Sequence, residues 1–134
     1  MRRNLERERK RKQRRKLKQK QLPYLKLLKL ADAVFSKWIR DRDGWTCIVC
    51  GTDENIQNGH LIPRENKAVR FSETNCNGLC GRCNWRDRFW HHHYEVAWLK
   101  KWGVLPMYDL QERANVKIKL TRQDLEEIIR KYTL

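Results

Sequence analysis

The sequence predicts an α+β domain that is stapled by zinc, flanked by α-helices and preceded by a basic N-terminal arm. Two Cys-x2-Cys pairs, Cys47/Cys50 and Cys80/Cys83, have the ligand type and spacing to close a tetrahedral zinc shell. Apolar residues recur at helical spacing before and after these pairs. Residues 1–29 carry 14 basic and 2 acidic side chains, whereas the remaining residues are nearly balanced in charge.

The charge of the chain points to a polyanionic partner. Of a formal net charge of +15, +12 lies in residues 1–29. Nucleic acid is favoured, because each phosphate contact releases counterions and strengthens binding. A membrane is disfavoured, because residues 2–20 have only Leu5 and Leu17 as apolar residues and no apolar run approaches transmembrane length. We therefore expect a soluble, cytoplasmic protein.

Two units are expected, a basic arm over residues 1–22 and a domain over residues 23–134. Leu22-Pro23 marks the boundary, since proline fits the first turn of a helix but not its interior. The arm consists of good helix formers, and such a tract is compatible with a helix on DNA and disorder without it. We expect it to bind nucleic acid through residues such as Arg14 and Arg15. The alternative is a solvated tail or a localisation signal.

Helices are predicted on both sides of the cysteine pairs. The first spans Tyr24 to about Arg40, where Leu27, Ala31, Val34 and Trp38 share one side. A long helix is predicted from Asn84 to Trp102 and ends at Gly103. The side of it that we expect to face the core carries Trp85, Phe89, His92, Val96 and Leu99.

Shorter elements are expected between and after these helices. His60-Leu61-Ile62 is predicted to be a short strand that ends at Pro63, and residues 64–74 a loop. Residues 103–120 are predicted to be irregular or a short helix, with the alternating residues 116–120 forming a brief strand. Thr121 and Asp124 give a helix-start pattern for the C-terminal segment.

The four paired cysteines predict a structural zinc site. Four thiolates leave no open position on the metal, so this zinc would not take part in catalysis. Paired free cysteines fit a reducing compartment better than a disulfide framework. The fifth cysteine, Cys76, is expected to be a small buried side chain.

The residues between the cysteine pairs follow a known order. Gly59-His60 precedes Pro63, Asn75 lies five residues before Cys80, and Asn84 follows Cys83 directly. This order resembles the HNH nucleases, which have a ββα-metal core. The resemblance implies that His60 is the general base, that Asn75 orients it, and that Asn84 binds a divalent cation at the scissile phosphate. Taken singly, Asn84 could also be no more than an N-cap.

The chemistry of these residue types fits such roles. An imidazole with an ordinary pKa of ~6.5 can accept a proton from water at neutral pH. An amide oxygen such as that of Asn84 is a hard ligand that suits Mg²⁺ or Mn²⁺. Arg64, Arg70 and Arg88 are candidates to contact phosphates.

Over residues 30–132 the chain is also similar to the NinG (Rap) family of phage recombination nucleases. The shared segments are Trp38-Ile-Arg-Asp-Arg-Asp43, Cys47-Ile-Val-Cys50-Gly51, Gly59-His60, Arg70-Phe71, Asn75, Cys80-Gly-Arg-Cys83-Asn84 and Leu120 to Tyr132. This resemblance implies a metal-dependent endonuclease that cuts branched DNA, such as D-loops or Holliday junctions, in the cytoplasm of the phage's host. An enzyme that cuts two strands would be expected to act as a homodimer.

One position departs from the common HNH pattern. Many HNH nucleases have Asp immediately before the catalytic His, as a second cation ligand, and here that residue is Gly59. His91 and Asp87, which share a helix side with Asn84, are candidates to replace it, and Asp53 and Glu73 are further ones. Two alternatives therefore stay open: a non-catalytic, zinc-stapled nucleic-acid-binding protein derived from an HNH fold, or an HNH nuclease with another target, such as a nicking or homing enzyme.

Overall fold

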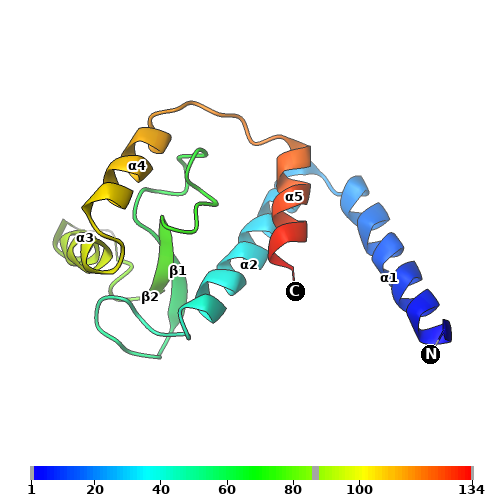
Figure 1. Cartoon of the computed structure of the whole chain (residues 1–134), viewed down its shortest axis with the longest axis horizontal. Coiled ribbons are helices and arrows are strands. Elements are labelled where there is room, and N and C mark those ends of the chain that lie inside the picture. The colour runs from blue at the N-terminus through cyan, green and yellow to red at the C-terminus, as the bar shows by residue number, and fades with distance from the viewer. Residues whose placement is uncertain (1, 86–87, 134) are drawn as a thin grey trace.

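The fold is organised around the long helix α2, Tyr24–Arg42. Its buried residues Leu27, Ala31, Phe35 and Ile39 recur every four positions, which places them on one face of the helix. This computed structural model describes residues 2–85 and 88–133. In chain order its elements are α1 (Arg2–Gln21), α2, β1 (Ile56–His60), β2 (Cys76–Cys80), α3 (Arg88–Trp102), α4 (Val104–Ala114) and α5 (Arg122–Tyr132) (Figure 1). The predicted α+β class is confirmed.

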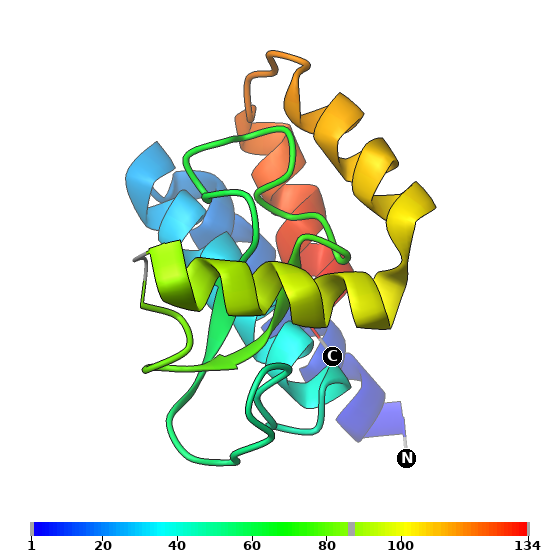
Figure 2. The same cartoon turned by 90° about the vertical axis from the view of Figure 1, so that its left-hand side faces the viewer.

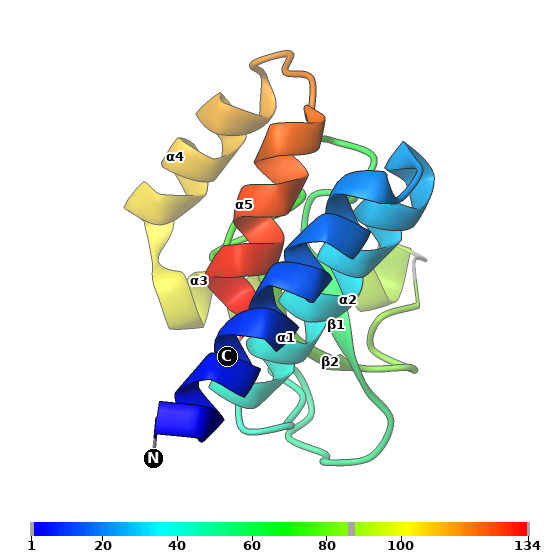
Figure 3. The same ribbon diagram turned by 90° about the vertical axis from the view of Figure 1, so that its right-hand side faces the viewer.

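Helix α5 lies along α2, and their apolar faces form one part of the core (Figure 3). The ring of Tyr132 packs edge-on against Phe35, with 4.8 Å between the ring centroids, and against Trp38 at 5.0 Å. The start of α5 is fixed by a reciprocal cap, as the sequence predicts. The Asp124 N–H donates to Thr121 Oγ1 at 3.1 Å, and the Thr121 N–H donates to Asp124 Oδ2 at 2.8 Å.

The sheet consists of β1 and β2, paired antiparallel with Ile56 opposite Cys80 and His60 opposite Cys76. The prediction of a strand over residues 60–62 is wrong, since the strand ends at His60. Beyond it, the N–H of Leu61 still donates to the Asn75 carbonyl, but both backbone groups of Ile62 bond to the Asn75 side chain. A side-chain amide thus replaces the strand partner and turns the chain into the predicted loop.

Helix α3 covers the side of the sheet opposite α2 (Figures 1 and 2). It begins at Arg88 rather than at Asn84, and the predicted core face is wrong. Tyr94 and Trp98 are buried, whereas Trp85, Phe89, His92, Val96 and Leu99 are exposed.

Apolar residues occur on every side of α3, so their spacing alone does not select the core face. Hydrogen bonds select it instead, because buried Tyr and Trp side chains need polar partners. Tyr94 Oη donates to the Gly59 carbonyl at 2.7 Å. Trp98 Nε1 donates to the Thr74 carbonyl at 2.7 Å, and Trp102 Nε1 to Asn77 Oδ1 at 3.2 Å.

The segment after α3 forms α4, which confirms the short-helix alternative for residues 103–120. The brief strand predicted over residues 116–120 is wrong. These residues have no ladder partner among the described residues, because they bridge α4 and α5 across the top of the molecule in Figure 1.

The basic arm is a helix in this structure. Helix α1 projects from the rest of the molecule, and all its described side chains are exposed (Figure 1). Arg14 and Arg15 lie on it, both exposed. Within the described residues, none of the helices combines the length and the apolarity that crossing a bilayer requires.

Substitution on α3 tests which of its faces packs on the sheet. Trp98 is 0 % exposed, so Trp98→Ala should lower the free energy of unfolding by about 3–5 kcal/mol through the cavity it leaves. Phe89 is 62 % exposed, so Phe89→Ala should change it by less than about 0.5 kcal/mol. Urea unfolding followed by circular dichroism measures both values, and the reverse order would contradict the described orientation.

Candidate functional site

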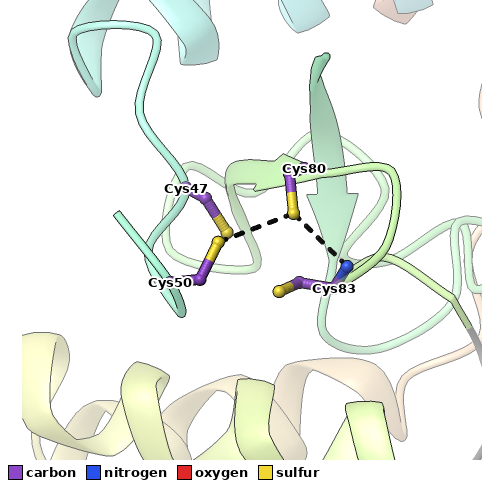
Figure 4. Close-up of side chains that lie close together, drawn as sticks. All are labelled: Cys47, Cys50, Cys80 and Cys83. Atoms are coloured by element: carbon purple, nitrogen blue, oxygen red, sulfur yellow. Dashed lines mark hydrogen bonds between the residues drawn. The ribbon is translucent and has the colours of Figure 1, made fainter. Parts of the chain in front are cut away.

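Four cysteine side chains gather at one end of the sheet (Figure 4). Their sulfur atoms all lie within 4.8 Å of one another, and Cys50 Sγ is 3.7 Å from Cys80 Sγ. A tetrahedral zinc with Zn–S bonds of ~2.3 Å would separate its sulfur ligands by about 3.8 Å. Cys47, Cys50, Cys80 and Cys83 therefore fit a closed zinc site, as the sequence predicts.

The local backbone holds the cysteine pairs in place. The N–H of Gly51, at a φ of 74°, donates to the Cys47 carbonyl, and this conformation is one that glycine adopts at no steric cost. The N–H of Ile48 donates to the Gly78 carbonyl of β2 at 2.9 Å. The first pair is thus fastened to the strand that ends in Cys80.

The surroundings of the thiols shift their pKa values in different directions. A backbone hydrogen bond from Thr52 lowers the pKa of Cys50 to about 7. Burial raises the pKa of Cys80 and that of Cys83. Thiolates at this spacing repel one another, so a cation is needed to keep all four sulfurs ionised.

A polar pocket of about 240 Å³ lies at the other end of β1. Its lining residues come from α2, β1, the loop after β1 and the turn after Cys83: Asp32, Ser36, Asn58, His60, Arg64 and Asn84. The structure thereby brings together the predicted base His60, the predicted cation ligand Asn84 and the predicted phosphate contact Arg64. No cysteine is among the described residues that line the pocket, but Asn84 directly follows Cys83, so the pocket borders the cysteine cluster.

The imidazole of His60 is oriented by a backbone carbonyl. His60 Nε2 lies 2.9 Å from the carbonyl oxygen of Arg70. Because a carbonyl can only accept, Nε2 carries the proton, and in the neutral ring the lone pair is on Nδ1. In this tautomer Nδ1 is the basic nitrogen of the ring.

Asn75 is fully buried, and its three side-chain hydrogen bonds go to the loop backbone. Nδ2 donates to the carbonyls of Ile62 and Val69 at 2.9 and 3.1 Å, and Oδ1 accepts from the Ile62 N–H at 2.8 Å. Asn75 therefore shapes the loop that carries Arg70, and the orienting contact on the His60 ring comes from the Arg70 carbonyl.

Asn84 lies in the turn before α3, not on the helix. Its N–H donates to the Cys80 carbonyl at 2.8 Å, and its Nδ2 donates to Gln57 Oε1 at 2.9 Å. Oδ1 would lie 3.3 Å from a Cβ atom placed on Gly59. The amide oxygen thus lies over Gly59.

Packing explains the glycine at position 59. A Cβ atom there would meet Leu79 Cδ2 at 2.6 Å and Leu79 Cβ at 2.8 Å, distances that require the sheet to shift. Since Leu79 is buried in the core, aspartate at position 59 would cost packing.

Among the described residues, the predicted site residues Arg70, His91, Glu73 and Asp53 are not part of the pocket lining. Arg70 forms an ion pair with Asp32, and His91 Nε2 lies 3.4 Å from Glu95 Oε1 on α3. Glu73 accepts a hydrogen bond from Tyr132, and Asp53 is exposed. Asp87 lies outside the described residues, as does the side chain of Arg88.

Sequence reasoning missed three pocket residues: Asp32, Ser36 and Asn58. Asn58 shares a strand face with His60 because the two are two positions apart, and the correct strand boundaries would have shown it. Asn58 Oδ1 is buried without a hydrogen-bond partner among the described residues. Asp32 and Ser36 are four positions apart on α2. No pattern in the sequence indicates that this part of α2 packs against the loop that follows β1.

Zinc content tests the cysteine cluster. The purified protein should bind one zinc per chain, and Cys83→Ser should lose it and unfold at a lower urea concentration, because metal binding contributes directly to folding. Cys76→Ala is the control, since Cys76 is buried outside the cluster and its loss should leave the zinc content unchanged. Metal analysis by mass spectrometry gives the result, and a metal-free wild-type protein with an intact fold would contradict the assignment.

Comparison with known protein families gives one assignment. The family model described as Bacteriophage Lambda NinG protein matches residues 1–134. The chain therefore belongs to the NinG family, which confirms the family resemblance. Comparison with curated proteins gave no match, and neither did comparison with solved structures.

Proposed function

We propose that this member of the NinG family is a metal-dependent DNA endonuclease of the HNH type that acts in phage recombination. The observation that carries the proposal is the orientation of His60 in a polar pocket. Its Nε2–H is held by the Arg70 carbonyl, so Nδ1 is the basic nitrogen, and Asn84 and Arg64 line the same pocket. Phosphodiester hydrolysis needs a general base, an oxygen ligand for a metal ion and a positive side chain that holds the phosphate. His60, Asn84 and Arg64 are of these three types, in that order.

In the proposed reaction, His60 Nδ1 takes a proton from a water molecule, whose oxygen attacks the phosphorus atom. The P–O bond to the leaving oxygen then breaks in line with the attack. Arg64 is exposed at the rim, where its guanidinium can hold a phosphate oxygen. The Arg70 carbonyl keeps its hydrogen bond to Nε2–H and stabilises the imidazolium that forms.

We propose that the pocket takes a hard divalent cation that is held mainly by the substrate. Mg²⁺ keeps several waters and takes one or two protein ligands together with phosphate oxygens. Asn84 Oδ1 is the protein ligand that we propose, because its Nδ2 is already bonded to Gln57. When bound there, Mg²⁺ or Mn²⁺ would stabilise negative charge on the phosphate and on the leaving oxygen.

Branched DNA is the substrate class that we propose. Membership of the NinG family suggests a role in phage recombination, in which branched DNA is the intermediate. Exposed Trp85 directly follows Asn84, and exposed Phe89 lies in the first turns of α3. Exposed aromatic rings stack on unpaired bases, which occur in the displaced strand of a D-loop but not within an intact duplex. The projecting basic helix α1 would bind neighbouring phosphates without regard to sequence.

A non-catalytic DNA-binding protein is the second candidate. It is favoured by one observation: among the described residues, Asp32 is the only carboxylate in the pocket lining, and Arg70 occupies both of its oxygens. Nuclease assays separate the two functions, because only the first requires His60.

The catalytic role of His60 can be tested against another histidine of the same chain. With Mg²⁺ or Mn²⁺, the wild-type protein should cleave D-loop or four-way-junction DNA. His60→Ala should reduce the cleavage rate by about 10²–10⁴-fold, because the general base is removed, while DNA affinity stays the same. His92→Ala should cleave at the wild-type rate, since His92 is exposed on α3 outside the pocket lining. Gel-based cleavage assays and fluorescence anisotropy give the two quantities.

Two results would refute the nuclease proposal. The first is binding of branched DNA without cleavage under any metal condition, which would favour the non-catalytic candidate. The second is cleavage by His60→Ala at the wild-type rate.

The salt dependence of DNA binding tests the arm. Replacing Arg14 and Arg15 with glutamine should make the plot of log K against log salt shallower, by roughly one unit of slope for each phosphate that the variant no longer neutralises. The matched control replaces Lys117 and Lys119, which are exposed between α4 and α5, with glutamine and should leave the slope unchanged. Equal slopes for the Arg14/Arg15 variant and the wild type would exclude the arm as part of the DNA interface.

A further inference from the structure

We infer that Asp32 is a positioning residue for His60: its ion pair with Arg70 holds the Arg70 carbonyl where it accepts the His60 Nε2–H. The catalytic consequence rests on the proposed function, in which His60 is the base. The positioning itself does not, because it concerns the geometry of the free protein.

The ion pair is bidentate and largely shielded from water. Arg70 Nε donates to Asp32 Oδ1 at 2.9 Å, and Nη2 donates to Oδ2 at 2.5 Å. The Arg70 side chain is 13 % exposed and that of Asp32 24 %. A third donor, Arg70 Nη1, bonds to the Arg64 carbonyl at 3.2 Å. The planes of the Arg70 guanidinium and the Asp32 carboxylate are therefore fixed relative to each other. This is the geometry in which an arginine–carboxylate pair is strongest.

These bonds assign Arg70 a different task from the phosphate contact that its sequence position suggested. Three of its N–H groups are used within the protein, and the Asp32 carboxylate neutralises its charge. Contact with Asp32 raises the pKa of Arg70, so the pair stays ionised. What Arg70 presents to the pocket is its carbonyl oxygen, 2.9 Å from His60 Nε2.

Packing of helix α2 in the core fixes the position of Asp32. Asp32 follows fully buried Ala31, and buried Leu27 and Phe35 fasten the same stretch of helix. The loop is held at a second point, where Asn75 Nδ2 binds the carbonyl of Val69, the residue before Arg70. The Arg70 carbonyl is thus held by Asn75, which directly precedes β2, and by Asp32 on α2.

This arrangement also argues against Asp32 as a cation ligand. Both carboxylate oxygens are engaged by one guanidinium, and binding a cation there would require that pair to separate. A positioning role keeps the pair intact throughout the reaction. The two roles therefore predict different results when the charges are exchanged.

The ring of His60 gives a readout that does not depend on activity. In ¹⁵N-labelled wild-type protein, at a pH where the ring is neutral, NMR should show the Nε2–H tautomer with a slowly exchanging proton. In Asp32→Asn, which keeps the shape but removes the charge, that proton should exchange at least about tenfold faster, because its acceptor is no longer fixed. Asp41→Asn is the control: Asp41 lies on the same helix, is exposed and pairs with Lys37, so the His60 signal should not change.

Charge exchange separates positioning from cation binding. The double variant Asp32→Arg/Arg70→Asp restores an ion pair and should recover the slow exchange and most of the cleavage rate. Asp32→Asn alone should lower the cleavage rate about tenfold to hundredfold without changing DNA affinity, since displacement of a catalytic group by about an ångström costs on that order. Arg70→Lys keeps the positive charge but cannot form two parallel hydrogen bonds to the Asp32 carboxylate. Its cleavage rate should therefore lie between that of the wild-type protein and that of Asp32→Asn.

Each outcome decides the inference. Unchanged exchange of the His60 Nε2 proton in Asp32→Asn, with the fold intact by circular dichroism, would overturn it. So would a folded double variant that recovers neither signal nor activity, which would favour a direct role of the Asp32 carboxylate. If the wild-type protein cleaves no DNA but the proton exchange responds as expected, the proposed function fails and the positioning role stands.

Discussion

The antiparallel pairing of β1 with β2 is the constraint on which both candidate sites depend. It sets Cys80 opposite Ile56 at one end and Cys76 opposite His60 at the other, so one short sheet joins the cysteine cluster to the pocket. A slip of one residue would turn Asn58 and His60 to the opposite face. Tyr94 and Trp98 on α3 hold the pairing from one side, through the carbonyls of Gly59 and Thr74. Zinc at the cysteines would fasten the far end.

Much of the fold could be predicted because local signals agree with tertiary packing. For α2 the apolar spacing gives the helix and places Leu27 and Ala31 on its buried face. The predicted partners Val34 and Trp38 are only half-buried, and Phe35 and Ile39 are buried instead. For α3 the local signal is ambiguous, because aromatic residues surround the helix and only distant acceptors, such as the Thr74 carbonyl, decide which of them are buried. The predicted strand over residues 60–62 was wrong for a related reason, since β1 ends at His60. A strand is defined by its partner, and here a buried amide, Asn75, ends the pairing.

The candidate site was predictable to the extent that its residues stand in a fixed order around the cysteines. His60 and Asn84 were found in this way, and the structure brings them into one pocket. Asp32 could not be found, because 38 residues separate it from Arg70 and a lone acid on a helix usually lies on a solvated face. For Arg70, the sequence predicted a phosphate contact because it could not show the partner of this side chain. Its charge is visible in the sequence, but the carboxylate that neutralises it is not.

A crystal of the protein with branched DNA and Mn²⁺, measured at the zinc and manganese absorption edges, tests the division into two metal sites most directly. The account predicts zinc between Cys47, Cys50, Cys80 and Cys83, and manganese in the pocket beside Asn84 Oδ1, with a DNA phosphate next to His60. DNA bound with its phosphates away from the pocket, or a pocket without manganese in that complex, would contradict it.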